Sequence, residues 1–243
     1  MERVIYDRIR ELETGHWWFV ARRKVLDRLI RRLAPPAGAA ILEVGCGAGG
    51  NIPVLQPYGS VTALEPDADS RAYVAERFGI PVDGGLLPDG LPYPAASFDL
   101  ICAFDVIEHV DDDAGSVAAL GALLKDGGAL LTTVPAYQWM WSHHDAQHHH
   151  KRRYTLGRYR KLFEQAGLTV ETAGYFNTLL FPIAAAQRLI KRLLGDHSAD
   201  DAMPPAWLNR TLTAIFALEA GPASVGALPF GVSIALIARK PAR

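Results

Sequence analysis

The stretch Ile41-Leu-Glu-Val-Gly-Cys-Gly-Ala-Gly-Gly50 decides the fold of this chain. An apolar run, typical of a buried parallel strand, leads directly into a turn that is crowded with glycine. Gly45, Gly47 and Gly49 permit backbone angles that are closed to residues with a Cβ, and they let the main chain approach a ligand closely. The helix expected next offers unpaired N–H groups, so the sequence predicts a site for an adenosine-containing ligand here.

Two classes of cofactor fit this turn. Gly45, Gly47 and Gly50 also satisfy the G-x-G-x-x-G pattern of dinucleotide-binding enzymes. Glu43 is an acid in a strand that should be buried on both faces, so it needs a local partner among backbone or ligand N–H groups. The run Val61–Glu65 is interpreted as the next strand, and its terminal carboxylate can accept both hydroxyls of a ribose. That carboxylate suits either class.

Further motifs separate the two classes. Leu42–Gly49 is followed by Glu65, then by Ser97–Ile101, and then by Asp105–Val110. This set, in this order, resembles the class I S-adenosylmethionine-dependent methyltransferases of the type 11/12-like subgroup, over residues 40 to 175. The resemblance implies a transferase that uses S-adenosyl-L-methionine. An NAD-dependent oxidoreductase and a non-catalytic regulator that binds the cofactor are the alternatives.

The composition fits one enzyme domain. The chain has 243 residues, of which 49% are hydrophobic and 21% charged, and its formal charge of -1 gives no general attraction to nucleic acid. Cys46 and Cys102 are too few for a disulfide framework and fit a reducing compartment. No uninterrupted apolar stretch reaches the roughly 18 residues that a membrane span needs. We therefore expect a cytoplasmic protein with a small-molecule acceptor; the oligomeric state stays open.

The alternation of apolar runs with helical periodicity predicts an α/β fold, a Rossmann-like, mostly parallel sheet of seven strands between helices. The expected strands cover residues 40–44, 60–65, 79–82, 98–103, 128–134, 168–174 and 231–238. The resemblance implies that the last strand is antiparallel. We expect a single domain over 1–243, with an N-terminal helical lid at 1–34, a cofactor-binding core at 38–175, a helical insert at 176–230 and a closing strand at 231–240.

The resemblance assigns the nucleoside end of the cofactor to residues that follow the second and third strands. Glu65 would hold the ribose, and Pro66 would lie against the adenine. Many relatives carry an acid after the third strand, whereas this chain has Leu86 and Leu87 there. We expect their backbone groups to contact the adenine, with Asp89 as the alternative.

The methionine end is assigned to Phe104 and Asp105, which follow the fourth strand. The carboxylate of the cofactor needs a cation, and Arg22 or Arg23 in the N-terminal helix can supply a planar fork. The adjoining Trp17–Phe19 is either the apolar stripe of that helix or a lid that excludes water. The full predicted cofactor-binding set is Arg22, Arg23, Glu43, Gly45, Cys46, Gly47, Gly49, Glu65, Pro66, Leu86, Leu87, Phe104 and Asp105.

Methyl transfer is a direct displacement, so the protein mainly aligns the reactants and excludes water. A hydroxyl nucleophile must still lose its proton, and a histidine is the expected base. The chain concentrates histidines at 143–150, in a loop after the fifth strand that resembles the substrate loop of methyltransferases acting on cell-envelope sugars or lipids. The predicted catalytic residues are His144, Asp145 and His109.

The same loop supplies most of the predicted acceptor contacts. Arg152 and Arg153 could clamp a phosphate or carboxylate, although solvated loop charges are the alternative. The predicted substrate-binding residues are Trp18, Tyr137, Trp141, Arg152, Arg153 and Tyr154. We expect O-methylation of a sugar, a lipid-linked sugar or a quinone-like acceptor.

Several histidines and carboxylates of the chain are also possible metal ligands. Possible ligands are Glu108, His109, His143, His144, Asp145 and His148–His150, and Glu-His after the fourth strand resembles quinone-pathway O-methyltransferases. Their spacing matches no compact motif such as H-E-x-x-H, so no metal site is predicted.

The insert at 176–230 is expected to be a cap, a dimer contact or a site of peripheral membrane contact. The segment 179–194, with a cationic edge at Arg188, Lys191 and Arg192, would make the membrane contact.

Overall fold

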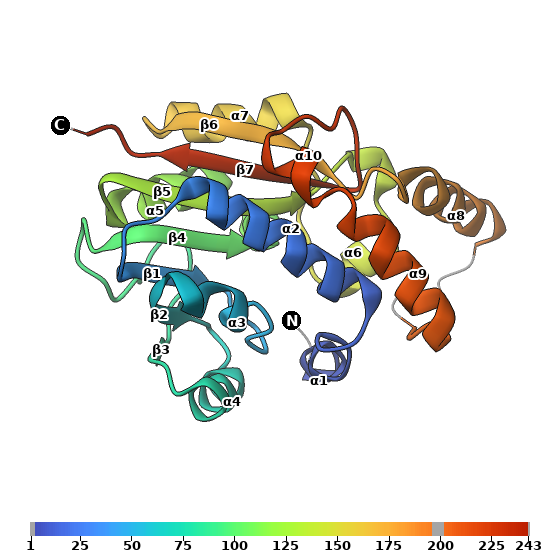
Figure 1. Cartoon of the computed structure of the whole chain (residues 1–243), viewed down its shortest axis with the longest axis horizontal. Coiled ribbons are helices and arrows are strands. Elements are labelled where there is room, and N and C mark those ends of the chain that lie inside the picture. Colours follow the sequence, from blue (N-terminus) through green and yellow to red (C-terminus); the bar gives the residue numbers. More distant parts are fainter. Residues whose placement is uncertain (1–2, 196–201, 243) are drawn as a thin grey trace.

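Seven strands form one sheet in the order β3-β2-β1-β4-β5-β7-β6 (Figure 1). This computed structural model describes residues 3–195 and 202–242. The strands are β1 (Ala39–Val44), β2 (Gly59–Leu64), β3 (Val82–Asp83), β4 (Phe98–Phe104), β5 (Leu124–Pro135), β6 (Thr169–Phe176) and β7 (Ser233–Arg239). The first five pair in parallel, whereas β7 runs antiparallel to β5 and β6. The predicted Rossmann-like sheet with an antiparallel last strand is confirmed.

The third strand begins later than predicted. It was expected over 79–82, but β3 starts at Val82. Gly79 adopts a φ of 65° and forms the left-handed C-cap of helix α4 (Ala68–Phe78), which is a common role of glycine. Ile80 and Pro81 then connect this cap to β3.

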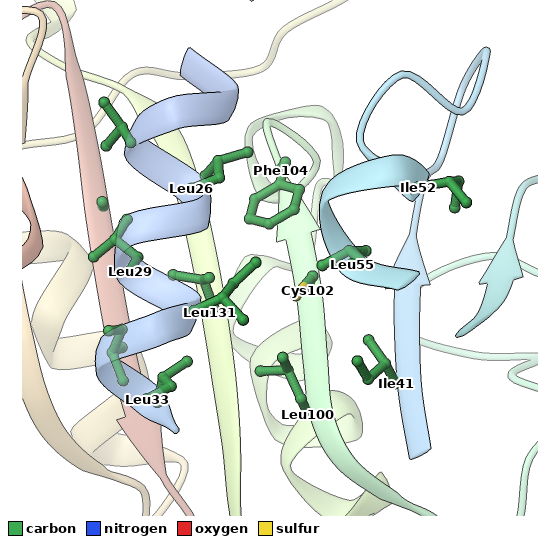
Figure 2. Packing of buried hydrophobic residues seen from close by; sticks show 14 of the residues in the cluster. Leu26, Leu29, Leu33, Ile41, Ile52, Leu55, Leu100, Cys102, Phe104 and Leu131 are labelled. Atoms are coloured by element: carbon green, nitrogen blue, oxygen red, sulfur yellow. The ribbon is translucent and has the colours of Figure 1, made fainter. Parts of the chain in front are cut away.

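Helices cover both faces of the sheet. The first face carries α2 (Trp17–Leu33), α3 (Ile52–Leu55), α4, α9 (Ala206–Ala217) and α10 (Ala220–Ser224), and the second carries α5 (Asp113–Leu123) and α7 (Leu156–Gln165). Figure 2 shows the first core, in which Leu100, Cys102 and Leu131 of the sheet meet apolar side chains of α2 and α3. The structure also contains the short 3-10 helices η1 (Gln56–Tyr58), η2 (Ile107–His109) and η3 (Gln138–Met140).

Helix α2 belongs to the core for most of its length. Its buried side chains include Val25, Leu26, Leu29 and Leu33, which belong to the first core. Figure 2 shows Leu26, Leu29 and Leu33 beside the sheet. Helix α1 (Arg3–Leu12) precedes it and lies apart from the sheet (Figure 1). Within the lid predicted at 1–34, the later turns of α2 are thus part of the hydrophobic core.

The insert predicted at 176–230 folds into two parts. Helices α9 and α10 pack on α2, where Phe216 and Ala223 join the core. Helix α8 (Phe181–Leu194) buries none of its own residues in the described structure. Its Arg188 and Arg192 donate hydrogen bonds to backbone carbonyls of residues 139–141, so much of the predicted cationic edge holds α8 to the loop after β5.

Helix α8 nevertheless keeps an apolar surface. Its exposed large apolar residues are Ile183, Leu189, Ile190, Leu193 and Leu194. Within residues 3–195 and 202–242, no helix combines the length and the apolar character needed to cross a membrane.

Candidate active site

A cavity of about 1030 Å³ opens at the carboxyl ends of the parallel strands. Its lining includes the last residues of β1, β2, β4 and β5, which are Val44, Leu64, Phe104 and Pro135. Ligands bind at this edge in open α/β sheets. Small-molecule sites are typically about 300–1,000 Å³, so this cavity has room for a cofactor and a second ligand together.

The glycine turn forms one wall of the cavity. Gly45 has a φ of 66°, and a Cβ added to it would lie 2.7 Å from Cγ2 of Val106, so a larger residue would strain the turn. Gly47 has a φ of 56°, and in the described structure a Cβ there would meet no atom within 4 Å. Both line the cavity, whereas Gly49 is buried against Phe78 of α4. The turn therefore presents bare backbone to a ligand at Gly47.

Glu65 lies at the end of β2 and is only 2% exposed. Its carboxylate accepts hydrogen bonds from the N–H of Gly47 at 2.8 Å, the N–H of Asp67 at 3.1 Å and the hydroxyl of Tyr6 at 3.0 Å. Tyr6 belongs to α1 and lines the cavity, and sequence reasoning missed it. Its hydroxyl bonds to Glu65 as a ribose hydroxyl would.

Arg22 and Arg23 point to different partners. Arg22 is 4% exposed, and its Nη2 donates to Oδ2 of Asp105 at 2.5 Å and to Oγ1 of Thr133 at 3.0 Å. Its Nε finds no hydrogen-bond partner among the residues that the structure describes. Arg23 instead donates to the backbone carbonyl of Glu13 at 2.6 Å. Arg22 is therefore the cation with a free donor, and it lies beside the predicted methionine-binding residue Asp105.

Two aromatic residues flank the guanidinium of Arg22. Its carbon Cζ lies 4.9 Å from the ring centroid of Trp18 and 5.5 Å from that of Phe104. Trp17, Trp18 and Phe19 all line the cavity. Trp18 and Phe19 pack edge-to-face, and Trp17 also packs against Phe216 of α9. The aromatic run thus has both predicted features, because all three rings border the cavity and Trp17 and Trp18 also pack against the hydrophobic core.

Glu43 lies behind the glycine turn and is 1% exposed. Its Oε1 accepts a hydrogen bond from Nδ2 of Asn51 at 3.0 Å, while Oε2 has no partner within the described ranges. Burial raises the pKa of Glu43 to about 7, although the hydrogen bond from Asn51 and the charge of Arg22 oppose the rise. Asn51, which also lines the cavity, was missed in the sequence.

This raised pKa predicts a pH-dependent stability. Between its usual value of 4.5 and about 7, native Glu43 keeps a proton that the unfolded chain has lost. The stabilisation is thus fully present below pH 4.5 and is lost as the pH rises through 7. Relative to Glu43→Gln, the wild type should lose up to about 3 kcal/mol of unfolding free energy between pH 4.5 and 8, measured by urea denaturation. Glu76→Gln, at an exposed position on α4, is the control and should follow the wild type.

The histidine-rich loop contains a buried ion pair. Asp145, in helix α6 (His143–Gln147), is fully buried, and its Oδ1 lies 2.8 Å from Nε of Arg153 and 2.8 Å from Nδ1 of His150. Its Oδ2 accepts from the N–H of Ser142 at 2.8 Å as part of a capping box. Burial alone would raise the pKa of Asp145, but His150 and Arg153 hold it well below its usual value. Asp145 itself is not part of the cavity lining, whereas His150 and Arg153 are.

Glu108, His109 and His150 form a cluster at the cavity. One ligand-type atom from each lies within 4.8 Å of the others. Burial, together with the neighbouring His150, lowers the pKa of His109 to about 3. His144 also lines the cavity, and burial and His148 lower its pKa to about 3. Sequence reasoning missed His150 as a catalytic candidate, although its place in the histidine run was visible.

The predicted site residues thus fall into two groups. Those that line the cavity are Trp18, Arg22, Arg23, Gly45, Cys46, Gly47, Glu65, Pro66, Leu86, Leu87, Phe104, Asp105, His109, His144 and Arg153. Those outside its lining are Glu43, Gly49, Tyr137, Trp141, Asp145, Arg152 and Tyr154. The second group contains four of the predicted acceptor contacts.

Three of those four side chains, of Tyr137, Arg152 and Tyr154, contact other residues, and Trp141 is held through its backbone. Tyr154 is fully buried and donates its hydroxyl to Oδ2 of Asp113 at 2.9 Å, and Arg152 pairs with the same carboxylate at 2.8 Å. Tyr137 stacks on Tyr175 with 5.3 Å between ring centroids. The backbone carbonyl of Trp141 accepts from Arg192 of α8.

Comparison with known proteins agrees with the fold. A family model described as a methyltransferase domain matches residues 18–173. A probable S-adenosylmethionine-dependent methyltransferase of Mycolicibacterium smegmatis is 32% identical over 171 residues, which are 68% of this chain and 65% of that protein. A ubiquinone biosynthesis O-methyltransferase of Methylocella silvestris is 36% identical over 137 residues, 54% of this chain and 51% of that one. The chain thus spans about half to two thirds of the length of these relatives.

Solved structures share the fold at low sequence identity. The methyltransferase in complex with the Haloferax volcanii activator Trm112 superposes with a TM-score of 0.65 at 18% identity, covering 97% of this chain and 94% of that one. The [4+2]-cyclase SpnF gives 0.65 at 20% identity, covering 98% and 94%. Because one of these is a cyclase, the fold alone does not fix the reaction. The family match extends over more than half of the chain, and this protein belongs to the class I S-adenosylmethionine-dependent methyltransferase family.

Proposed function

We propose that this protein transfers a methyl group from S-adenosyl-L-methionine to an oxygen atom of a small molecule. The observation that carries the proposal is the pair of groups that one cavity holds, the carboxylate of Glu65 beside the Gly47 backbone and the guanidinium of Arg22 beside Asp105. A nucleoside that carries an amino acid needs both kinds of group. A neutral nucleoside would use the first alone.

The cavity residues fit this cofactor. Glu65 would accept the ribose hydroxyls in place of the Tyr6 hydroxyl that it binds now. The free Nε of Arg22 is a donor for the cofactor carboxylate, since within the part of the chain that is described nothing else accepts from it. Asp105 is the acceptor available for the cofactor ammonium. Pro66 and Leu87 line the same cavity as Glu65 and would border the adenine.

When bound, the cofactor supplies a methyl group on a positively charged sulfur. The residues of this chain then have two tasks, which are to exclude water and to take the proton of the acceptor hydroxyl. Trp18 and Phe19 border the cavity with α1 and would limit access of water. Glu108, His109 and His150 are the titratable cluster that the acceptor hydroxyl would face. Asp145 would act through His150, which it orients.

The class of acceptor is inferred from chemistry and from the relatives. Ubiquinone biosynthesis O-methyltransferases at 34 to 36% identity support transfer to oxygen. The formal charge of -1 supports a small molecule rather than a nucleic acid. We therefore propose a hydroxyl-bearing acceptor such as a quinone-like compound, a sugar or a lipid-linked sugar.

Calorimetry tests the cofactor part of this proposal. S-adenosylhomocysteine should bind one site per chain with a dissociation constant of micromolar order, about −8 kcal/mol, while NAD should give no heat at the same concentrations. The reason is that the site offers a cation and a carboxylate for the amino-acid end, which NAD lacks. Binding of NAD in preference to S-adenosylhomocysteine, or no binding of the latter at millimolar concentration, would contradict the proposal.

A further inference from the structure

We infer that Glu108, His109 and His150 bind one divalent transition-metal cation, such as Zn²⁺, at the acceptor end of the cavity. The sequence spacing predicted no metal site, because two of the residues follow β4 and the third follows the helix after β5. The binding of the cation stands on the geometry alone. The role that we give it in methyl transfer rests on the proposed function.

The three side chains converge. One ligand atom from each residue lies within 4.8 Å of the others, and the rings of His109 and His150 meet at 89° with 4.6 Å between their centroids. Metal–nitrogen and metal–oxygen bonds of zinc are about 2.0–2.2 Å, so two ligand atoms on one ion are at most about 4.4 Å apart. Small rotations of these side chains would therefore bring all three onto a single ion.

The state of Glu108 is the second, independent observation. The side chain is fully buried, and neither carboxylate oxygen has a hydrogen-bond partner anywhere in the described structure. Leaving a carboxylate buried without a partner is costly, and proteins resolve this with a counter-charge, a proton or a metal. The carboxylate lines the cavity beside the two imidazoles, so a cation at their centre would give it the missing partner.

The surroundings of His150 match those of a metal ligand. Its Nδ1 is 2.8 Å from Oδ1 of the buried Asp145, which leaves Nε2 as the ligand atom. A carboxylate behind a ligating histidine fixes the orientation of the ring and raises its basicity. The N–H of Lys151 donates to the backbone carbonyl of Glu108 at 2.7 Å, so the two segments that supply the ligands are also joined through their backbones.

The donor set indicates the kind of metal. Two imidazoles and one carboxylate are the protein ligands of catalytic zinc sites and of non-haem Fe(II) sites, whereas Mg²⁺ and Ca²⁺ prefer oxygen ligands throughout. Three protein ligands leave a coordination position open toward the cavity. With the ion bound, the three ligands would not themselves act as the base. An acceptor hydroxyl at the open position would instead have a lowered pKa, and its O–H bond would break with release of the proton to water. The oxygen would then form its new bond to the methyl carbon as the bond from that carbon to sulfur breaks.

The test uses the full chain, stripped with a chelator and titrated with Zn²⁺ alone. We expect one Zn²⁺ per chain by calorimetry and by elemental analysis. Glu108→Gln and His150→Ala should each weaken binding by at least about 100-fold, since even the loss of an outer partner of a ligand costs 10- to 100-fold. His143→Ala, an exposed histidine of the same loop outside the cavity lining, is the matched control and should bind as the wild type does.

The d–d absorption of Co²⁺ added in place of Zn²⁺ gives a second readout, which should change in Glu108→Gln even if that variant still binds metal. The inference is overturned if the chain binds no Zn²⁺ or Co²⁺, or if Glu108→Gln and His150→Ala both bind the metal as tightly as the wild type and His143→Ala do. Binding of S-adenosylhomocysteine to the metal-free chain separates the two proposals. If the nucleoside binds and the metal does not, the metal site is wrong and the proposed function stands. If the metal binds and the nucleoside does not, the metal site stands and the proposed function is wrong.

Discussion

Replacing Glu65 with alanine is expected to weaken the binding of S-adenosylhomocysteine by at least about 100-fold, measured by calorimetry. The carboxylate is 2% exposed and would accept two hydroxyls of the ribose, and hydrogen bonds to a charged group contribute about 1.5–3 kcal/mol each. The N–H of Gly47 would lose its acceptor in the same variant. Glu65→Gln should have a smaller effect, because its amide oxygen still accepts one hydrogen bond.

Tyr6→Phe is the control for this prediction. It removes the hydroxyl that now binds Glu65 but leaves the carboxylate in place, so the affinity for S-adenosylhomocysteine should stay the same or increase. Glu76→Ala, on the exposed side of α4, should leave the affinity unchanged. If Glu65→Ala binds the ligand as tightly as these two variants, the assignment of the ribose to Glu65 is wrong.

Replacing Asp145 with alanine is expected to lower the unfolding free energy by about 3–5 kcal/mol, because it removes one partner of a buried ion pair. Arg153 is 3% exposed and would keep its charge without the carboxylate that balances it. The N-terminal cap of α6 would be lost at the same time, since Asp145 accepts from the N–H of Ser142. Urea denaturation at neutral pH measures the difference.

An exposed ion pair provides the comparison. Arg160 and Glu164 pair at 2.7 Å on the surface of α7, and pairs of this kind contribute about 0.2–1 kcal/mol. Glu164→Ala should therefore lower the unfolding free energy by less than about 1 kcal/mol. Equal losses in Asp145→Ala and Glu164→Ala would mean that the buried pair does not stabilise the loop, and that Asp145 does not hold His150 in place.

The fold could be predicted from the sequence because its signals are local. The apolar run before Gly45 and the acid at Glu65 mark two neighbouring strands, and parallel strands bring such residues to one edge. The position of β3 was missed by a few residues, since the same Gly79 could begin a strand or cap a helix. Only the surrounding structure selects the cap.

The candidate site was less predictable, because it depends on the directions of side chains. Tyr6 lies 59 residues from Glu65, and no spacing rule relates α1 to the end of β2. His150 meets Asp145 because His149, with a φ of 56°, reverses the chain after α6. Tyr154 was predicted to face the acceptor, but it forms a bridge with Ala136 that turns its ring into the core.

The bond between Tyr6 and Glu65 has a consequence for the kinetics of the protein. Without a nucleoside, the Glu65 carboxylate accepts a hydrogen bond from the Tyr6 hydroxyl. A ribose hydroxyl would replace that donor on binding, so the carboxylate would have a hydrogen-bond donor both before and after the exchange. For this exchange the Tyr6 hydroxyl must leave Glu65, which requires movement of the Tyr6 side chain or of helix α1. This movement is a unimolecular step that precedes binding. The observed rate of association should therefore level off at high nucleoside concentration, and Tyr6 should limit access to Glu65.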